Sequence, residues 1–266
     1  MQRNRLQTEI IPAPGGLERA QRGGFVPSRL ARTCGGNAFW NEAHQAFHGL
    51  VMQQQFPCVG ARAACNAEAY VLAVYELLSS EKTTVALARD LYEFTHSELR
   101  GDSDYATFVA VFQNAEAPDE AQFENKMWQQ LTELNRIDAA HFEWDPGVRS
   151  DPADPKFSFS FGGQALYVIG MHPNSSRIAR RFNWPAMIFN PHEQFERLRA
   201  DGKWKQMQQT IRERDVHLQG SVNPMLSDFG QASEARQYSG RAVEEDWEAP
   251  FKAARPSATG KCPFGH

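Results

Sequence analysis

The stretch GMHPNSSRIARR, residues 170–181, carries side chains that could hold both a metal and an anion. His172 follows an apolar run, so it is expected at the carboxyl end of a strand, where ligand-binding residues often lie. Ser175 and Ser176 could cap a following helix and direct free backbone N–H groups at an anion. Three arginines then follow at helical spacing: Arg177, Arg180 and Arg181. The first and last would share a helix face and could clamp a carboxylate or phosphate, but a solvated basic helix fits the same pattern.

A second histidine, His192, opens the next predicted helix within FNPHEQFERLR, residues 189–199. Asn190 is a plausible N-cap and Pro191 suits the first helical position. The helix dipole disfavours an imidazolium at this end, so a neutral imidazole is expected there. His192 could therefore ligate a metal or act as a base, and simple exposure at a helix start is the alternative.

Cys58 lies in FPCVG, directly before another predicted helix. Amides at a helix N-terminus stabilise a thiolate, so the pattern predicts a lowered pKa and a nucleophile or an axial metal ligand. A small buried residue at a tight turn is the alternative. His44 and His48 have the i, i+4 spacing of a metal pair, but position 45 is Gln, so no HExxH motif is present.

The segment SEARQYSGR, residues 233–241, gathers polar side chains without periodicity. A carboxylate beside amide and phenol groups suits recognition of a guanidinium or an amine, although surface loops look similar. The candidates for contact with such a substrate are Glu234, Arg236, Gln237 and Tyr238.

Composition limits the class of protein. The chain has 266 residues and a net charge of −4, enough for one large domain with a sizeable core and unfavourable for nucleic acid as the main partner. The sequence has no signal-peptide core at its start and no apolar run that could span a bilayer, so we expect a soluble, cytoplasmic protein. Four cysteines without CxxC spacing are expected to be free thiols: Cys34, Cys58, Cys65 and Cys262.

Apolar periodicity predicts the elements that must position these residues. Residues 1–36 are expected to form a loose arm that could pack on a second copy in a homodimer, and residues 37–266 a single domain. Helices are expected at 37–56, 59–78, 85–99, 118–134 and 192–215, and strands at 105–112, 157–161, 165–169 and 186–189. This order predicts an α+β fold, with N-terminal helices on a small, mostly antiparallel or mixed sheet and a long helix and ordered loops on the C-terminal side.

Several stretches carry a resemblance to a known family. They are FPCVGARAA (56–64), TFVAVF (107–112), FENKMWQQL (123–131), DPADPKFSFSFGGQALYVIGMHPNSSRIARRF (151–182), FNPHEQFERLR (189–199), IRERDVHLQGSVNPMLSDFG (211–230) and SEARQYSGR (233–241). Together they resemble the YqcI/YcgG family, and most closely its branch of haem-dependent N-hydroxylases. That branch includes the guanitoxin-type enzyme and is related to the arginine N-hydroxylase of cycloserine biosynthesis.

The resemblance implies haem b, an electron donor with O₂, or peroxide, and oxidation of a guanidine or amine nitrogen in a small amino-acid-like metabolite. Under it, His172 is the favoured iron ligand, and the serines and arginines of 175–181 would hold the haem propionates. His192 is the alternative ligand, or a distal group that assists proton delivery, and Cys58 is a further candidate. The substrate-side catalytic candidates are then His192, Glu234, Arg236 and Tyr238. A haem carrier or sensor without catalysis is the alternative function.

Overall fold

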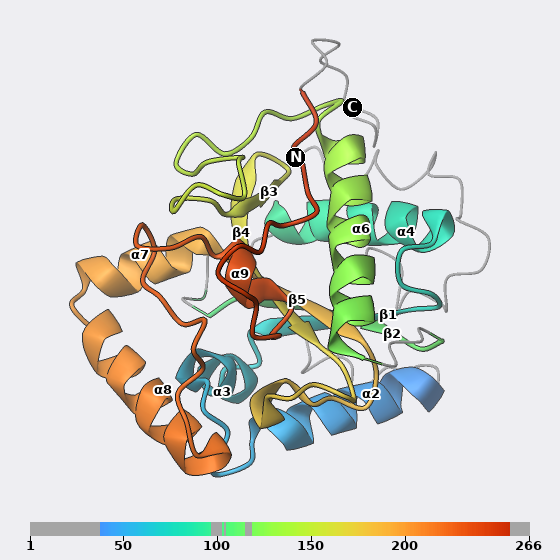
Figure 1. Ribbon diagram of the computed structural model, residues 1–266. Helices are drawn as coiled ribbons and strands as arrows, with labels where there is room; N and C mark the ends of the chain where they lie inside the picture. Colours follow the sequence, from blue (N-terminus) through green and yellow to red (C-terminus); the bar gives the residue numbers. More distant parts are fainter. Residues whose placement is uncertain (1–37, 97–102, 104, 115–118, 256–266) are drawn as a thin grey trace, which may run out of the picture.

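The computed structural model describes residues 38–96, 103, 105–114 and 119–255 (Figure 1). The predicted arm, Cys34 and Cys262 lie outside these residues. The helices within them are α2 (Ala38–Val51), α3 (Val59–Asn66), α4 (Glu81–Thr95), α6 (Glu120–Asp138), α7 (His192–Ala200), α8 (Trp204–Gln219), α9 (Ala235–Tyr238) and the 3₁₀ turn η1 (Ile178–Arg180). The strands are β1 (Tyr70–Tyr75), β2 (Thr107–Phe112), β3 (Phe159–Phe161), β4 (Gln164–Met171) and β5 (Ala186–Pro191).

The strands form one mixed sheet in the order β1-β2-β5-β4-β3. β1 and β2 are parallel and are connected through α4, and the remaining neighbours are antiparallel. Tyr70 pairs with Thr107 at one end of the β1–β2 ladder. The predicted single-domain α+β fold with a small mixed sheet is confirmed.

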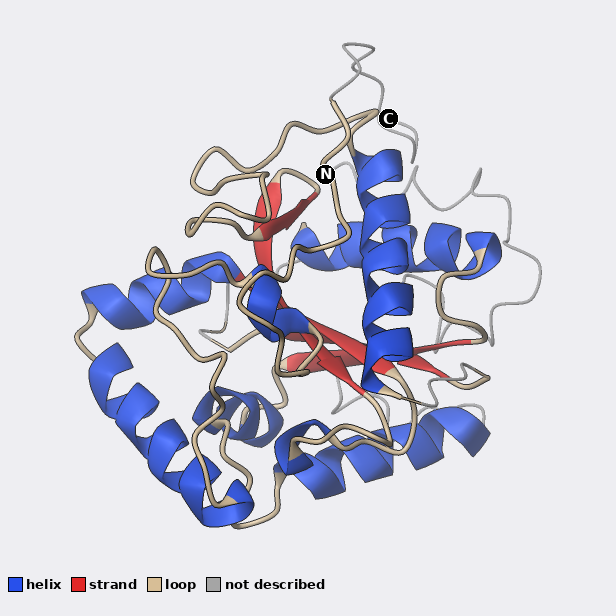
Figure 2. Cartoon of the chain, viewed as in Figure 1, coloured by secondary structure: helices blue, strands red, loops and turns tan. Residues whose placement is uncertain are grey.

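Side chains alternate between the two faces of the sheet and contribute to two separate hydrophobic clusters. Phe108 and Phe189 point to the face covered by α4 and α6, which we call the first face. Leu72, Val109 and Ile188 point to the opposite face, where α2 packs and which we call the second face. Figure 2 shows α4 and α6 on one side of the sheet and α2 and α3 on the other. The fold is therefore layered, with helices covering both faces of the sheet.

Two predicted helices are wrong. The segment expected to be helical over 59–78 forms α3 and then β1, because Glu68 takes a left-handed φ of 51° and turns the chain into a strand that pairs with β2. The long helix expected over 192–215 is divided into α7 and α8 by Gly202, whose φ is +72°. A glycine adopts this left-handed conformation without the steric cost that other residues incur.

Other elements begin and turn where the sequence places them. Asp119 accepts a hydrogen bond from the backbone N–H of Gln122 at 2.8 Å and so caps α6. The predicted hairpin forms between β3 and β4, with Gly162 and Gly163 both at positive φ. Of the helices that the structure describes, none has the length and apolar character that crossing a membrane requires.

Candidate functional site

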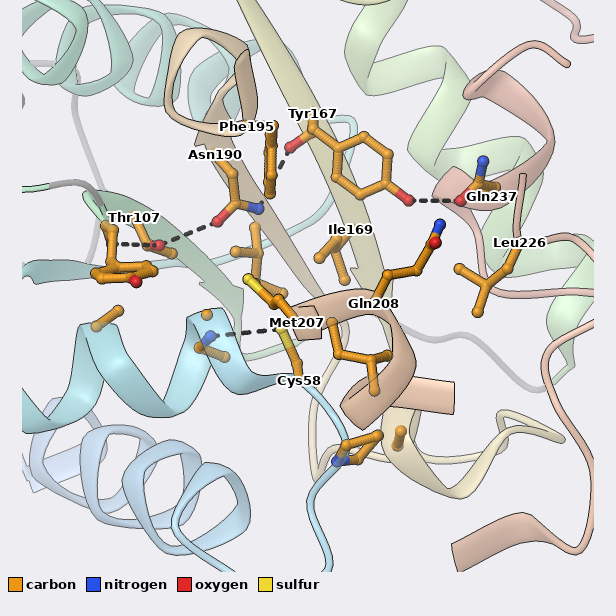
Figure 3. A pocket seen from close by; sticks show the side chains of 18 of the residues that line it. Cys58, Thr107, Tyr167, Ile169, Asn190, Phe195, Met207, Gln208, Leu226 and Gln237 are labelled. Carbon is orange, nitrogen blue, oxygen red and sulfur yellow. Dashed lines mark hydrogen bonds between the residues drawn. The ribbon is translucent and has the colours of Figure 1, made fainter. Parts of the chain in front are cut away.

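A cavity of about 250 Å³ lies on the second face, next to the C-terminal end of α2, from which Phe47 and Val51 contribute to its wall. Helices α3, α7 and α8 enclose it together with the loop that follows α8 (Figure 3). Its walls are mostly apolar and aromatic, as in small-molecule sites. They include Phe56, Ile169, Ile188, Phe195, Met207 and Ile211.

Hydrogen bonds between neighbouring strands fix the polar groups of the cavity floor. Thr107 donates from its hydroxyl to Oδ1 of Asn190 at 3.0 Å, and Nδ2 of Asn190 donates to the Tyr167 carbonyl at 3.4 Å. The Tyr167 hydroxyl donates to Oε1 of Gln237 at 2.9 Å (Figure 3). Burial raises the pKa of Tyr167, so its hydroxyl stays protonated near neutral pH. The floor therefore presents oriented, neutral hydrogen-bonding groups.

Arg180 brings a positive charge to the cavity wall without a carboxylate partner. Its guanidinium donates to the carbonyls of Gly170 at 3.0 Å, Gln237 at 3.2 Å and Tyr238 at 3.4 Å. Within the described ranges, no carboxylate lies at ion-pair distance from it. Burial lowers the pKa of Arg180, but an arginine stays charged in proteins. A buried cation held only by carbonyl dipoles can still bind an anionic group.

Glu234 brings a buried carboxylate to the same cavity. Its Oε1 lies 3.4 Å from Nδ1 of His192, and the Tyr238 hydroxyl donates to its Oε2 at 3.4 Å. His192 is itself buried beside the cavity, with its ring edge-on to Phe229 at a centroid distance of 4.5 Å. Nε2 of His192 lies 3.3 Å from Glu196, which is half exposed. The imidazole and the carboxylate are thus close neighbours at ion-pair distance, but within the described residues Nδ1 of His192 makes no hydrogen bond.

The predicted arginine clamp is wrong. Over residues 170–181 the chain forms only the one-turn η1 and no α-helix, so Arg177 and Arg181 do not share a helix face. Arg177 donates to Asp215 of α8 at 2.6 Å, whereas Nε of Arg181 donates to the Ser175 carbonyl at 2.7 Å. The guanidinium groups of this segment therefore serve separate partners.

Backbone pairing explains why the segment does not become a helix. The N–H of His172 donates to the Arg180 carbonyl at 3.1 Å, and the N–H of Phe182 donates to the His172 carbonyl at 3.4 Å. These bonds close a loop between β4 and β5 and use groups that a helix would need.

Ser176 of this loop does bind an anion, but the anion belongs to the chain itself, and the Ser175 hydroxyl has no hydrogen-bond partner in the described residues. Both the backbone N–H and the hydroxyl of Ser176 donate to Oε1 of Glu120, each at 2.8 Å. Glu120 lies in the first turn of α6. This corner therefore ties β4 to α6, and Ser175 and Ser176 do not line the cavity.

His172 lies at the end of β4 as predicted, but on the first face. Its ring is fully buried and stacks on Phe123 of α6 at 4.6 Å. Neither ring nitrogen has a hydrogen-bond partner in the described part of the chain. Burial lowers the pKa of His172, while Glu120 and Asp119 act in the opposite direction. It is a buried imidazole with two open nitrogens, and it does not line the cavity.

Cys58 lies on the cavity wall at the N-cap of α3, where the sequence placed it. Its Sγ accepts a hydrogen bond from the Ala61 N–H at 3.4 Å. The predicted lowering of its pKa is wrong, because burial raises the pKa more than Ala61 and Arg180 lower it. Cys58 is therefore a neutral thiol. Across the described ranges, no group of three or more His, Cys, Asp or Glu side chains could hold a metal ion.

The segment SEARQYSGR contributes to the cavity in part. Glu234 and Gln237 line it, whereas Tyr238 is fully buried and accepts a hydrogen bond from the Phe159 N–H at 3.0 Å. Arg236 packs over the Trp247 ring at 5.8 Å and donates to carbonyls of the C-terminal loop, including that of Trp247 at 3.3 Å. Arg236 and Tyr238, both predicted to contact substrate, thus have structural partners away from the cavity.

The sequence analysis did not identify several residues as part of the cavity. Phe195, Met207 and Ile211 have helical apolar spacing, which predicts a core stripe equally well, yet they line the cavity. Tyr167 and Asn190 belong to strands. Asn190 is a polar residue near the end of an apolar strand, and this pattern could have indicated a polar group at the cavity floor. The sequence analysis interpreted Asn190 as a helix cap instead.

Comparison with known proteins assigns the chain to a family. The model of the YqcI/YcgG family matches residues 47–252, which include the cavity-lining segments and the loop between β4 and β5. A Bacillus subtilis (strain 168) protein, described as "uncharacterized protein YcgG", is 24% identical over 218 residues, covering 79% of this chain and 81% of that protein. No solved structure matches the chain significantly. The chain belongs to the YqcI/YcgG family.

Proposed function

We propose that this protein is a haem-dependent N-oxygenase. It would oxidise a guanidine or amine nitrogen of a small amino-acid-like metabolite in the cytoplasm, using O₂ and an electron donor, or peroxide. One observation carries the proposal. The mostly apolar cavity combines a half-buried guanidinium, Arg180, which has no carboxylate partner in the described residues, with a buried carboxylate, Glu234, that lies 3.4 Å from an imidazole, His192.

The residue types that line the cavity match the groups that haem b requires, and the cavity must open beyond its volume of about 250 Å³ to admit the macrocycle. A haem needs an axial ligand, apolar walls for the macrocycle and donors for its propionates. Aromatic and aliphatic side chains supply the walls, and Arg180 could hold an anionic propionate. Haem would supply the activation of oxygen or peroxide.

Among the candidate iron ligands, the geometry favours His192 over His172 and Cys58. His192 does not itself line the cavity, but it packs edge-on against Phe229, which does, and its buried Nδ1 makes no hydrogen bond within the described residues, so that nitrogen could bind iron. His172 has open nitrogens but lies on the first face, away from the cavity. Cys58 lines the cavity, but its Sγ already accepts a hydrogen bond from the Ala61 N–H at 3.4 Å.

The chain's own residues would bind and orient a zwitterionic substrate. Glu234 would attract the cationic amine or guanidinium of that substrate, while Arg180 serves the haem propionate. The oriented hydroxyl of Tyr167 and the amides of Asn190 and Gln237 would fix the position of the substrate. The apolar side chains of α7 and α8 would exclude water from the reacting nitrogen.

The absorption spectrum of the full chain, purified from cells supplied with a haem precursor, tests the cofactor. We expect a Soret band that is lost in His192→Ala and retained in His172→Ala. Retention in His192→Ala with loss in His172→Ala would assign the ligand to the first face and overturn the site proposed here. A chain that binds no haem on titration would overturn the function.

Product analysis separates the oxygenase from a haem carrier. The holoprotein is incubated with arginine and related amines, a reductant and O₂, or with peroxide, and the products are identified by mass spectrometry. We expect a hydroxylated nitrogen, with turnover reduced in Tyr167→Phe, which removes a hydroxyl proposed to position the substrate, while the haem content is unchanged. Haem without any oxidised product across this panel would favour the carrier.

A further inference from the structure

Three tyrosines line the cavity, and their hydroxyl groups have different partners. The Tyr70 hydroxyl lies 2.8 Å from Nε2 of His44. That of Tyr167 donates to the amide oxygen of Gln237, which cannot take up a proton near neutral pH. For Tyr105, the described residues provide no side-chain partner for the hydroxyl. Of these three, Tyr70 is therefore the one whose hydroxyl contacts a titratable base.

Stacking holds the His44 imidazole in place. Its ring stacks on Trp40 at 4.9 Å with an interplanar angle of 11°, and on Tyr70 at 5.8 Å and 12°. The Trp40 indole is fixed in turn, because its Nε1 donates to the Leu72 carbonyl of β1 at 2.9 Å. The imidazole, which α2 carries, is thus held against β1 with its Nε2 directed at the Tyr70 phenol (α2 and β1 are labelled in Figure 1).

A path for protons leads from this imidazole toward the surface. His44 is half-buried, and the exposed His48 lies one turn further along α2, at a ring distance of 6.4 Å. Tyr70 itself is only 1% exposed. The Tyr70 phenol therefore borders the cavity inside the protein, and His44, which would accept its proton, lies between the phenol and the surface.

The chemistry of phenols gives this geometry a consequence. A phenol that has lost an electron is a very strong acid, so a tyrosine is oxidised readily only where a base takes the proton in the same step. The base must lie at hydrogen-bond distance, as His44 does. We propose that Tyr70 is a redox-active tyrosine that gives one electron to an oxidant in the cavity while its phenolic proton passes to Nε2 of His44.

The step balances in electrons and protons. One electron leaves the Tyr70 ring for a one-electron oxidant, the O–H bond breaks, and an N–H bond forms on His44, leaving a neutral tyrosyl radical and an imidazolium. The electron donor of the proposed function then reduces the radical, and the proton returns to the phenolate oxygen. Tyr70 thereby acts as an internal one-electron donor to an oxidant in the cavity. Its natural oxidant rests on the proposed function, whereas the redox property of the pair does not.

Flash oxidation of the full chain without added haem tests the pair itself. A ruthenium tris-bipyridine photosensitiser with a sacrificial acceptor supplies the oxidant, and the radical is followed by electron paramagnetic resonance and transient absorbance. We expect a tyrosyl signal that is lost in Tyr70→Phe and retained in the matched cavity variant Tyr105→Phe. An unchanged tyrosyl signal in Tyr70→Phe would overturn the proposal.

The role of the base is tested by His44→Ala under the same flash. We expect a lower yield of tyrosyl radical and loss of the solvent deuterium isotope effect on its formation. This variant also serves if Tyr70→Phe fails to fold, as judged by circular dichroism. Radical formation at the wild-type rate with the same isotope effect in His44→Ala would exclude His44 as the proton acceptor.

A third experiment distinguishes failure of this proposal from failure of the proposed function. The haem-loaded chain is mixed with peroxide and frozen for electron paramagnetic resonance. A tyrosyl radical that disappears in Tyr70→Phe supports both. A radical on flash oxidation but none with haem and peroxide would overturn the link to the proposed function and leave the redox pair standing.

Discussion

The two faces of the sheet are built from the same strands but are filled differently. On the first face, α4 and α6 close over aromatic and aliphatic side chains such as Phe108, Leu131 and Trp128, all with 0% exposure. On the second face, α2 packs on part of the sheet, and a cavity remains next to its C-terminal end under α3, α7 and α8. In α8 the only buried residue is Asp215. The first face thus stabilises the fold, and the second leaves room for a ligand.

The largest expected effect compares one residue type on the two faces. Met127 of α6 is fully buried in the first-face core, whereas Met207 of α8 lines the cavity. Met127→Ala should lower the free energy of unfolding by about 2–5 kcal/mol, because it leaves a void among close-packed neighbours. Met207→Ala should cost less than about 1.5 kcal/mol, because it enlarges a space that already exists. Urea denaturation measures both, and equal losses would contradict the difference between the faces.

A buried carboxyl group makes the first face sensitive to pH. Burial raises the pKa of Asp138, at the end of α6, from 3.8 to about 7, although its Oδ1 accepts a hydrogen bond from the Gly162 N–H at 2.8 Å. Between pH 4 and pH 7 the native state therefore binds a proton that the unfolded chain has lost, so stability falls as pH rises through this range.

Asp138→Asn removes this titration and keeps an acceptor for Gly162. Relative to the wild type, the variant should gain stability from pH 5 to pH 8, with an upper bound of about 3 kcal/mol. Urea unfolding at the two pH values measures the gain. Parallel pH profiles for wild type and variant would show that the carboxyl is ionised in the native state.

A smaller effect is expected at the loop between β4 and β5. Ser176→Ala removes the hydroxyl bond to Glu120 but keeps the backbone N–H bond, so the free energy of unfolding should fall by about 0.5–1.5 kcal/mol. Ligand affinity should not change, because this corner does not line the cavity. Weaker haem binding in Ser176→Ala would instead support the propionate clamp that the sequence suggested.

Sequence reasoning succeeded where a local signal decides the structure. The start of α6, the two strands on either side of Gly162–Gly163 and the apolar strand β2 each follow from short patterns. Sequence reasoning failed where partners distant in the sequence determine the conformation of a segment. The run that forms β1 has helix-compatible spacing and becomes a strand only because β2 lies beside it.

The site was anticipated only in part for the same reason. Glu234, Arg180, Cys58 and the segment around His192 were chosen from their residue types, and the fold brings them to or beside one cavity. The alternation of β4 puts His172 on the other face, and the partners of Arg177 and Ser176 come from α8 and α6. Charged side chains in a sequence do not reveal whether their counter-charge is a ligand or another part of the chain.

The central claim is that the second-face cavity is the ligand site, and two helical glycines allow a direct test. A Cβ atom on Gly60 of α3 would lie 3.1 Å from Cε of Met207, so Gly60→Leu should fill cavity space at the expense of a flexible side chain. Gly49 of α2 has no atom within 4 Å of the corresponding position, so Gly49→Leu is the matched control. Haem titration followed at the Soret band should give a Kd at least tenfold higher, about 1.4 kcal/mol, for Gly60→Leu and an unchanged Kd for Gly49→Leu. Equal affinity for wild type and Gly60→Leu would contradict the assignment of the cavity.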